Sequence, residues 1–91
     1  MSYIVSKNIL IRKFENESAL INISNGHAIT LNDTGTVIFE QISATGDLEK
    51  VYQFMIDNYD ANPNELYNDI LSLLNTLVKA GIIQQEEVET Q

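Results

Sequence analysis

Hydrophobic and polar residues alternate in the first third of the chain, which is typical of β-strands. Ile9–Phe14 and Ala19–Ile23 are rich in β-branched residues, and the polar stretch 15–18 between them predicts a turn. Within the second segment, Ala19, Ile21 and Ile23 alternate with Leu20 and Asn22. This alternation predicts a strand with one buried face.

A third strand is predicted at His27–Leu31, after a second turn. Asn25-Gly26 precedes it, and this pair is the strongest short hairpin signal because both residues tolerate positive φ. The three segments therefore predict a small antiparallel β-meander. The edge strand of such a sheet exposes unpaired backbone groups.

The remaining chain has helical spacing of its apolar residues. Asn32, Asp33 and Thr34 can each cap the first helix through a side-chain oxygen. The expected helices are Asp33–Ile42, Asp47–Tyr59 and Pro63–Ala80, the last followed by Gly81 as a left-handed C-cap. Residues 1–8 are expected to be loosely held, Ile82-Ile83 either packs back or extends a strand, and 84–91 is expected to be a frayed acidic tail.

The third helix has a wider apolar face than core packing requires. Its main stripe is formed by Leu66, Ile70, Leu73, Leu74 and Leu77. A flank on one side of the stripe is formed by Tyr67, Leu71 and Val78. Together they span roughly 160°, whereas a core contact needs a little over 100°. The flank therefore meets either more core or a ligand, and both interpretations remain open.

Composition indicates one globular domain. The chain has 91 residues, 44% of them hydrophobic, which is enough for one modest core. It has no cysteine, which excludes disulfides, thiolate metal sites and cysteine nucleophiles and fits a reducing cytosol. The N-terminus does not resemble a signal peptide, and no apolar run is long enough for a membrane helix. We therefore expect a cytoplasmic protein with no membrane contact.

The charge pattern disfavours nucleic acid. The net charge is −8, with five basic against thirteen acidic residues, and phosphate backbones attract the opposite sign. Three basic residues lie in the first thirteen positions, while much of the acid follows Gly46. A basic partner segment would therefore be drawn to the helical half.

Enzyme chemistry has little support in the sequence. His27 is the only histidine and follows a turn, so a structural or exposed role is favoured over a general base. The carboxylates are scattered, and the glycines fall at turns and helix ends, so neither a metal site nor a phosphate loop is expected. We expect no catalytic residues, no metal and no cofactor.

Two binding modules fit the size and class in part. An acyl carrier protein needs a carrier serine, usually within Asp-Ser-Leu, and that tripeptide is absent. A winged helix DNA-binding protein has three helices and a small sheet, but its recognition helix should carry Arg and Lys. The third helix offers Lys79 against Glu65 and Asp69, which disfavours DNA.

Three motifs follow the predicted meander along the chain. They are Leu31-Asn32-Asp33-Thr34-Gly35-Thr36-Val37-Ile38-Phe39, then Tyr59-Asp60 with Pro63, and finally Gly81-Ile82-Ile83. The order and spacing of these elements, over about residues 9–83, resemble the PqqD-like family of precursor-peptide recognition elements. The chain departs from the family pattern in having Phe39 where Trp is common and no paired aromatics in the third strand. Because of these two departures, the motifs do not indicate one particular subfamily.

The resemblance implies a fold and a function. The fold is α+β and winged helix-turn-helix-like, a three-stranded antiparallel meander followed by three helices, in a single PqqD-like domain over 1–91. The leader of a ribosomally synthesised precursor peptide would add as an extra antiparallel strand to the edge of the third strand, beside the third helix. The expected peptide-binding residues are His27, Ala28, Ile29, Thr30 and Leu31 for the backbone, Tyr67, Leu71, Leu74 and Val78 for an apolar wall, and Asp69 or Asn75 for the rim.

The partners implied by the resemblance are the leader peptide and separate maturation enzymes. These would be a leader protease and a cyclase in lasso-peptide pathways, which are slightly favoured, or a radical enzyme in quinone-cofactor and thioether pathways. The alternative is a winged-helix nucleic-acid-binding module or an acidic protein-interaction module without a role in maturation. Monomer and homodimer both remain open, because an exposed strand edge can pair two copies.

Overall fold

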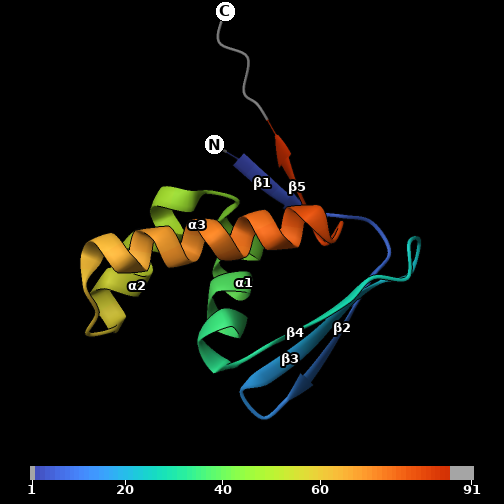
Figure 1. The fold of residues 1–91 in the computed structure, drawn as a ribbon, viewed down its shortest axis with the longest axis horizontal. Coiled ribbons are helices and arrows are strands. Elements are labelled where there is room, and N and C mark those ends of the chain that lie inside the picture. Colours follow the sequence, from blue (N-terminus) through green and yellow to red (C-terminus); the bar gives the residue numbers. More distant parts are fainter. Residues whose placement is uncertain (1, 87–91) are drawn as a thin grey trace, which may run out of the picture.

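The computed structural model describes residues 2–86 and has an α+β fold with two antiparallel sheets and three helices (Figure 1). The strands are β1 (Ser2–Val5), β2 (Ile9–Phe14), β3 (Glu17–Asn22), β4 (Ala28–Leu31) and β5 (Ile83–Glu86). The helices are α1 (Asp33–Thr45), α2 (Leu48–Asn58) and α3 (Pro63–Lys79). Within the described residues, no helix has the length and apolar character needed to cross a membrane.

The expected meander is confirmed as the three-stranded sheet β2-β3-β4. Both pairings are antiparallel, with Leu10 opposite Ile21 in one and Leu20 opposite Ile29 in the other. Strands β2 and β4 are the two edges of this sheet. At its far end β4 leads directly into α1, so the sheet and the helices meet at Leu31.

A second sheet, which the sequence analysis did not expect, joins the two ends of the described chain. Strand β1 pairs antiparallel with β5, with Ser2 opposite Glu86 and Val5 opposite Ile83. The expectation of a loosely held segment at 1–8 was wrong, because Tyr3 is only 2% exposed and packs in the core. Of the two alternatives for Ile82-Ile83, Ile83 begins a strand, and this strand takes residues 84–86 out of the expected tail. Residues 87–91 lie outside the described part.

The helix boundaries follow capping chemistry. Asn32 caps α1 as predicted, since its side-chain oxygen accepts the N–H of Gly35 at 2.8 Å. The helix runs to Thr45, past the expected end at Ile42, and stops at Gly46 with φ of 67°. A Cβ at Gly46 would lie 2.8 Å from the Tyr3 carbonyl oxygen, so glycine also lets β1 approach this turn. Asn62 caps α3, and Pro63 occupies its first turn, as expected.

The core lies between the three helices and the inner faces of both sheets. Helix α3 buries Leu66, Ile70, Leu74 and Leu77. These face α1 and α2, which bury Ile38, Phe39, Ile42, Leu48, Val51 and Met55. The apolar stripe predicted for α3 is therefore confirmed, except that Leu73 is only partly buried at its margin.

The buried face of β3 is the one that carries Leu20, and it includes two polar residues. Ser18 is 3% exposed, and its hydroxyl is hydrogen-bonded to that of Thr36 in α1 at 2.8 Å. Asn22, also buried, donates its side-chain N–H to the Gly81 carbonyl oxygen. The alternation of Ala19, Ile21 and Ile23 therefore indicated the wrong buried face, since Ile23 is 65% exposed. Hydrogen bonds from the sheet to α1 and to the end of α3 make this polar burial favourable.

Candidate functional site

Strand β4 has an open edge, and the ladder shows which of its backbone groups are available there. The Asn22 N–H donates to the His27 carbonyl oxygen at 2.8 Å. Hydrogen-bonded pairs recur every second residue in an antiparallel ladder, so Ile29 and Leu31 also direct their N–H and C=O groups toward β3. Ala28 and Thr30 therefore direct theirs away from β3, to the open edge.

A cleft of about 500 Å³ lies between the end of β4, the start of α1 and the middle of α3. It is lined by Thr30, Leu31, Asn32, Thr34, Gly35, Ile38, Asp69 and Leu73. Leu31 and Ile38 are buried and Leu73 is partly buried, so the floor and one wall are apolar. Asp69 is the one ionisable residue in this lining. An open strand edge beside an apolar cleft is the geometry used for strand addition.

Three of the residues expected at the site come together in this cleft. They are Thr30, Leu31 and Asp69. His27, Ala28 and Ile29 lie along the same strand or at its start, and the His27 backbone N–H donates to the Asn25 side chain at 2.8 Å.

The other expected residues of α3 lie elsewhere. Tyr67 contacts Tyr52 of α2 edge to face, with ring centroids 5.3 Å apart. Leu74 has no exposed surface, and Asn75 is exposed. Val78 lines a different hollow, and Leu71 shares the flank of Tyr67 and Val78 on the helix. The flank that faces β4 is the opposite one, with Asp69 and Leu73.

Five residues that line the cleft were not predicted for it, namely Asn32, Thr34, Gly35, Ile38 and Leu73. Leu73 was assigned to the core stripe, and a signal was present because it lies at the edge of that stripe. Ile38 and Gly35 were assigned to the junction motif alone. That motif holds both residues beside the end of β4, so it could have indicated the cleft.

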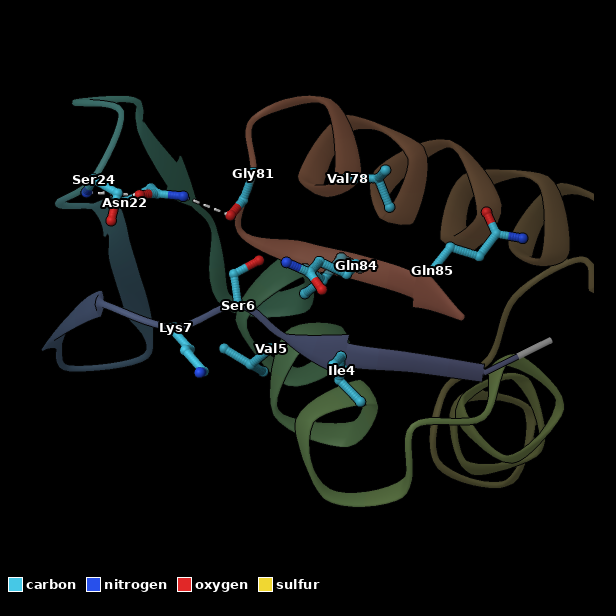
Figure 2. Close-up of a pocket in the computed structure, with 11 residues that line it drawn as sticks. Ile4, Val5, Ser6, Lys7, Asn22, Ser24, Val78, Gly81, Gln84 and Gln85 are labelled. Atoms are coloured by element: carbon cyan, nitrogen blue, oxygen red, sulfur yellow. Dashed lines mark hydrogen bonds between the residues drawn. The ribbon is translucent and has the colours of Figure 1, made fainter. Parts of the chain in front are cut away.

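A second hollow, of about 580 Å³, lies on the other side of the end of α3 (Figure 2). Val78 points into it from the helix, and Ile4, Val5, Gln84 and Gln85 line it from the β1–β5 ribbon. Strand β1 pairs with β5 along one edge. Along the other, Tyr3 N–H donates to the Gly46 carbonyl oxygen at 2.8 Å and Ser2 bridges to Asp47. Because β1 has backbone partners on both edges, it does not offer this hollow an open strand edge like that of β4.

Two asparagines fix the spacing between the β3–β4 turn and the end of α3. The side-chain N–H of Asn22 donates to the Gly81 carbonyl oxygen at 2.7 Å, which is drawn in Figure 2. The Asn25 side chain reaches the Ala80 carbonyl oxygen at a longer 3.4 Å. The oxygen of Asn22 also accepts the N–H groups of Ser24 and Asn25. We call this set the asparagine clamp. It ties the sheet to α3 beside the start of β4.

Charged groups in the described part of the chain are mostly solvated. An ion pair joins Lys13 of β2 to Glu40 of α1 at 2.9 Å, with both side chains about half exposed. No cluster of three potential metal ligands occurs in this part. Burial, and secondarily the proximity of Tyr67, raises the pKa of Tyr3 above its usual value of 10.0. Tyr3 therefore stays neutral at physiological pH.

Comparison with known proteins identifies the family. The family model described as coenzyme PQQ synthesis protein D (PqqD) matches residues 17–83, from β3 to the start of β5. The match covers well over half of the chain, and the chain belongs to the PqqD family. No curated protein sequence matches.

Two solved structures have a similar fold. One is TbiB1 in complex with the TbiA(beta) leader peptide, with a TM-score of 0.83 and 14% identity, covering 92% of this chain and 98% of that one. The other is a lasso peptide synthetase B1 complexed with the leader peptide, with a TM-score of 0.82 and 20% identity, covering 93% and 100%. At these identities the likeness is one of fold.

Proposed function

We propose that this protein binds the leader segment of a ribosomally synthesised precursor peptide as an added strand on β4. The observation that carries the proposal is the open edge of β4 beside the apolar cleft. Membership of the PqqD family supports it, as do two similar folds whose structures are complexes with leader peptides.

The register of the ladder supports separate proposed roles for neighbouring residues of β4. The outward backbone groups of Ala28 and Thr30 hydrogen-bond the peptide, which gives affinity without dependence on its sequence. Peptide side chains opposite Ile29 and Leu31 project toward α3, because side chains on adjacent strands share a face. The residues at the end of the cleft then contact the side chain opposite Leu31, with Leu73 and Ile38 as the apolar wall.

With the leader bound, the protein delivers the precursor peptide to separate enzymes that act on the core peptide. A leader protease and a cyclase are the partners in a lasso-peptide pathway, and a radical enzyme is the partner in other pathways. The protein itself performs no chemistry in this proposal and acts in the cytoplasm, as a monomer or a homodimer. The winged helix-turn-helix arrangement is part of the proposal, with the sheet edge taking peptide in place of DNA.

Nucleic acid is the less favoured ligand because of the charges on α3. Its exposed residues include Asp69 in the cleft lining and Glu65 one turn before it, and Lys79 lies at the C-terminal end of the helix. A recognition helix for DNA needs cations toward the groove. The acidic face of α3 instead favours a peptide that carries Lys or Arg.

The test is binding of a fluorescent leader peptide, measured by anisotropy. The peptide is a synthetic leader, taken from a short open reading frame to be sought beside this gene. Thr30→Pro removes an N–H that faces the open edge and leaves the bonds of Ile29 and Leu31 to β3 intact. We expect it to weaken binding by roughly tenfold or more, since a hydrogen bond is lost and the peptide carbonyl is left unpaired.

Two controls separate edge pairing from other effects. Thr30→Val keeps the N–H and the side-chain shape, so its binding should stay close to wild type. Ile11→Pro removes an outward N–H from β2, the opposite edge of the same sheet. If Ile11→Pro abolished binding while Thr30→Pro did not, the peptide would add to β2 and the assignment to β4 would be rejected. Saturable binding that none of the variants changes would reject strand addition altogether.

A further inference from the structure

Asp69 is placed to read one position of a bound peptide. It is exposed at the rim of the β4–α3 cleft and is the single ionisable residue among the eight that line it. Within residues 2–86 the structure gives Asp69 no ion pair, since the salt bridge described there joins Lys13 to Glu40. A carboxylate without a cationic neighbour at the end of an apolar cleft favours a cation on the ligand.

The direction of the added strand follows from the relation between β4 and α3. The asparagine clamp joins the turn before β4 to the C-terminal end of α3, whereas the last residue of β4, Leu31, shares the cleft with Asp69 and Leu73. Strand β4 and helix α3 therefore run in opposite directions. A peptide antiparallel to β4 runs in the direction of α3, and its N-terminal part lies at the Asp69 end.

The spacing of the two cleft residues matches the spacing of a strand. We call the peptide residue opposite Leu31 the anchor, and its side chain lies toward Leu73. The peptide residue two positions before the anchor projects from the same face, about 6.6 Å further along. On the helix, Asp69 precedes Leu73 by four residues, or about 6 Å along the axis. This peptide residue therefore reaches the level of Asp69.

The N–H groups at the start of a helix can attract an anion, which would oppose the preference of Asp69 for a cation. At the start of α1 two of these groups already have acceptors within the chain. The Gly35 N–H already donates to Asn32 Oδ1 at 2.8 Å, and the Thr34 N–H donates to Asp33 Oδ1 at 2.9 Å. These donors are satisfied by acidic or amide oxygens of the chain itself. These two N–H groups therefore do not offset the preference for a cation that the Asp69 carboxylate gives this end of the cleft.

We propose that Asp69 makes the site selective for peptides with Lys or Arg two residues before an apolar anchor. This inference rests on the proposed function, because it needs a peptide paired with β4. It goes further in naming a residue of this chain, a position in the ligand and the chemistry that joins them. Leu73 with Leu31 and Ile38 selects the apolar anchor, and Asp69 selects the cation.

The test is a selection of peptides rather than a measurement on one leader. An mRNA-display library of random 15-residue peptides is selected against the immobilised full-length protein and two variants, Asp69→Lys and Glu65→Lys. Glu65 is the matched control, because it is exposed on α3 one turn before Asp69 and does not line the cleft. Circular dichroism verifies that each variant is folded before the selection.

We expect wild type and Glu65→Lys to enrich Lys or Arg two residues before an apolar position. Asp69→Lys should instead enrich Asp or Glu there, with the apolar position retained. For one selected peptide, Lys→Gln at the cationic position should weaken binding to wild type by roughly two- to fivefold at low salt. The same change should have no effect on binding to Asp69→Asn.

The outcomes separate the two proposals. Enriched peptides without a cation at fixed spacing, or the same motif from Asp69→Lys as from wild type, would overturn the role of Asp69 and leave peptide binding standing. No enrichment by a folded wild-type protein would overturn the proposed function itself.

Discussion

At the scale of single residues, buried polar groups of β3 determine where the sheet sits on the helices. Ser18 holds the sheet to α1 through the hydroxyl of Thr36, and Asn22 holds it to the end of α3. Both side chains are less than 10% exposed. These bonds set the distance between β4 and α3, and the width of the cleft depends on that distance.

Asn22→Ala should destabilise the fold by about 1–3 kcal/mol, because the Gly81 carbonyl oxygen and two backbone N–H groups lose their partner. The measurement is the free energy of unfolding in urea. Asn25→Ala is the matched control, since its side chain makes two exposed bonds, a long one to the Ala80 carbonyl oxygen and one from the His27 N–H, and we expect a loss below about 1 kcal/mol. Equal losses for both variants would show that the Asn22 bonds are not the dominant part of the clamp.

The buried polar residues also explain one limit of sequence analysis at this scale. Hydrophobicity makes Ile21 and Ile23 look as suitable for the core as Leu20. The ladder, however, buries the face of Leu20, and Ile23 is left mostly exposed. Ser18 and Asn22 are favourable inside only because Thr36 and Gly81, distant in sequence, supply hydrogen bonds, and such partners cannot be identified from local pattern.

At the scale of elements, two helix starts and the turn before β4 could be predicted, because their signals lie within a few neighbouring residues. Asn32 and Asn62 marked two helix starts, and Asn25-Gly26 marked the turn before β4. Strand β1 has no comparable signal. It has four residues, and its partner β5 lies about eighty positions further along the chain. The family model likewise begins at residue 17, after β1 and β2.

The choice of flank on α3 illustrates a second limit at this scale. Periodicity located the apolar arc, but both margins of an arc are equivalent until the neighbouring elements are placed. In the structure α2 lies against Tyr67, while β4 approaches Leu73 and Asp69. The strand and the existence of a helix wall could therefore be predicted, whereas the residues of the wall required the three-dimensional arrangement.

Tyr3→Ala tests whether β1 is an integral part of the fold. Tyr3 is buried in the core cluster, and truncation of a buried aromatic side chain costs about 3–5 kcal/mol. We expect a large decrease in the urea midpoint. Ile4→Ala is the control on the same strand, because Ile4 is 45% exposed on the other face, and its cost should be below about 1 kcal/mol. A small effect of Tyr3→Ala would return β1 to the status of a loosely held segment.

At the scale of the whole molecule, we expect the net charge of −8 and the proposed contact at Asp69 to act on different steps of peptide binding. The overall field attracts a cationic peptide before contact, and this attraction changes the association rate. The charge is unevenly distributed, since Lys7, Arg12 and Lys13 belong to the sheet half and much of the acid lies in the helical half. A peptide approaching the cleft therefore meets the acidic half at α3.

The salt dependence of leader binding should reveal this division. For a leader with net positive charge, the association rate should fall by about tenfold between low and high salt, because the overall field is screened over about a Debye length. The dissociation rate should change by less than about twofold, since the paired strand and the apolar anchor are short-range contacts. Stopped-flow anisotropy measures both rates.

A leader variant with two Lys→Glu changes outside the paired segment is the control, and its association rate should lose the salt dependence. By contrast, Asp69→Asn should act mainly on dissociation of peptides that carry the cation before the anchor. Two results would contradict this prediction. Salt could act mainly on the dissociation rate, or the Glu-substituted leader could keep the salt dependence of its association rate. In either case the acidic surface would have no role in guiding the peptide to β4.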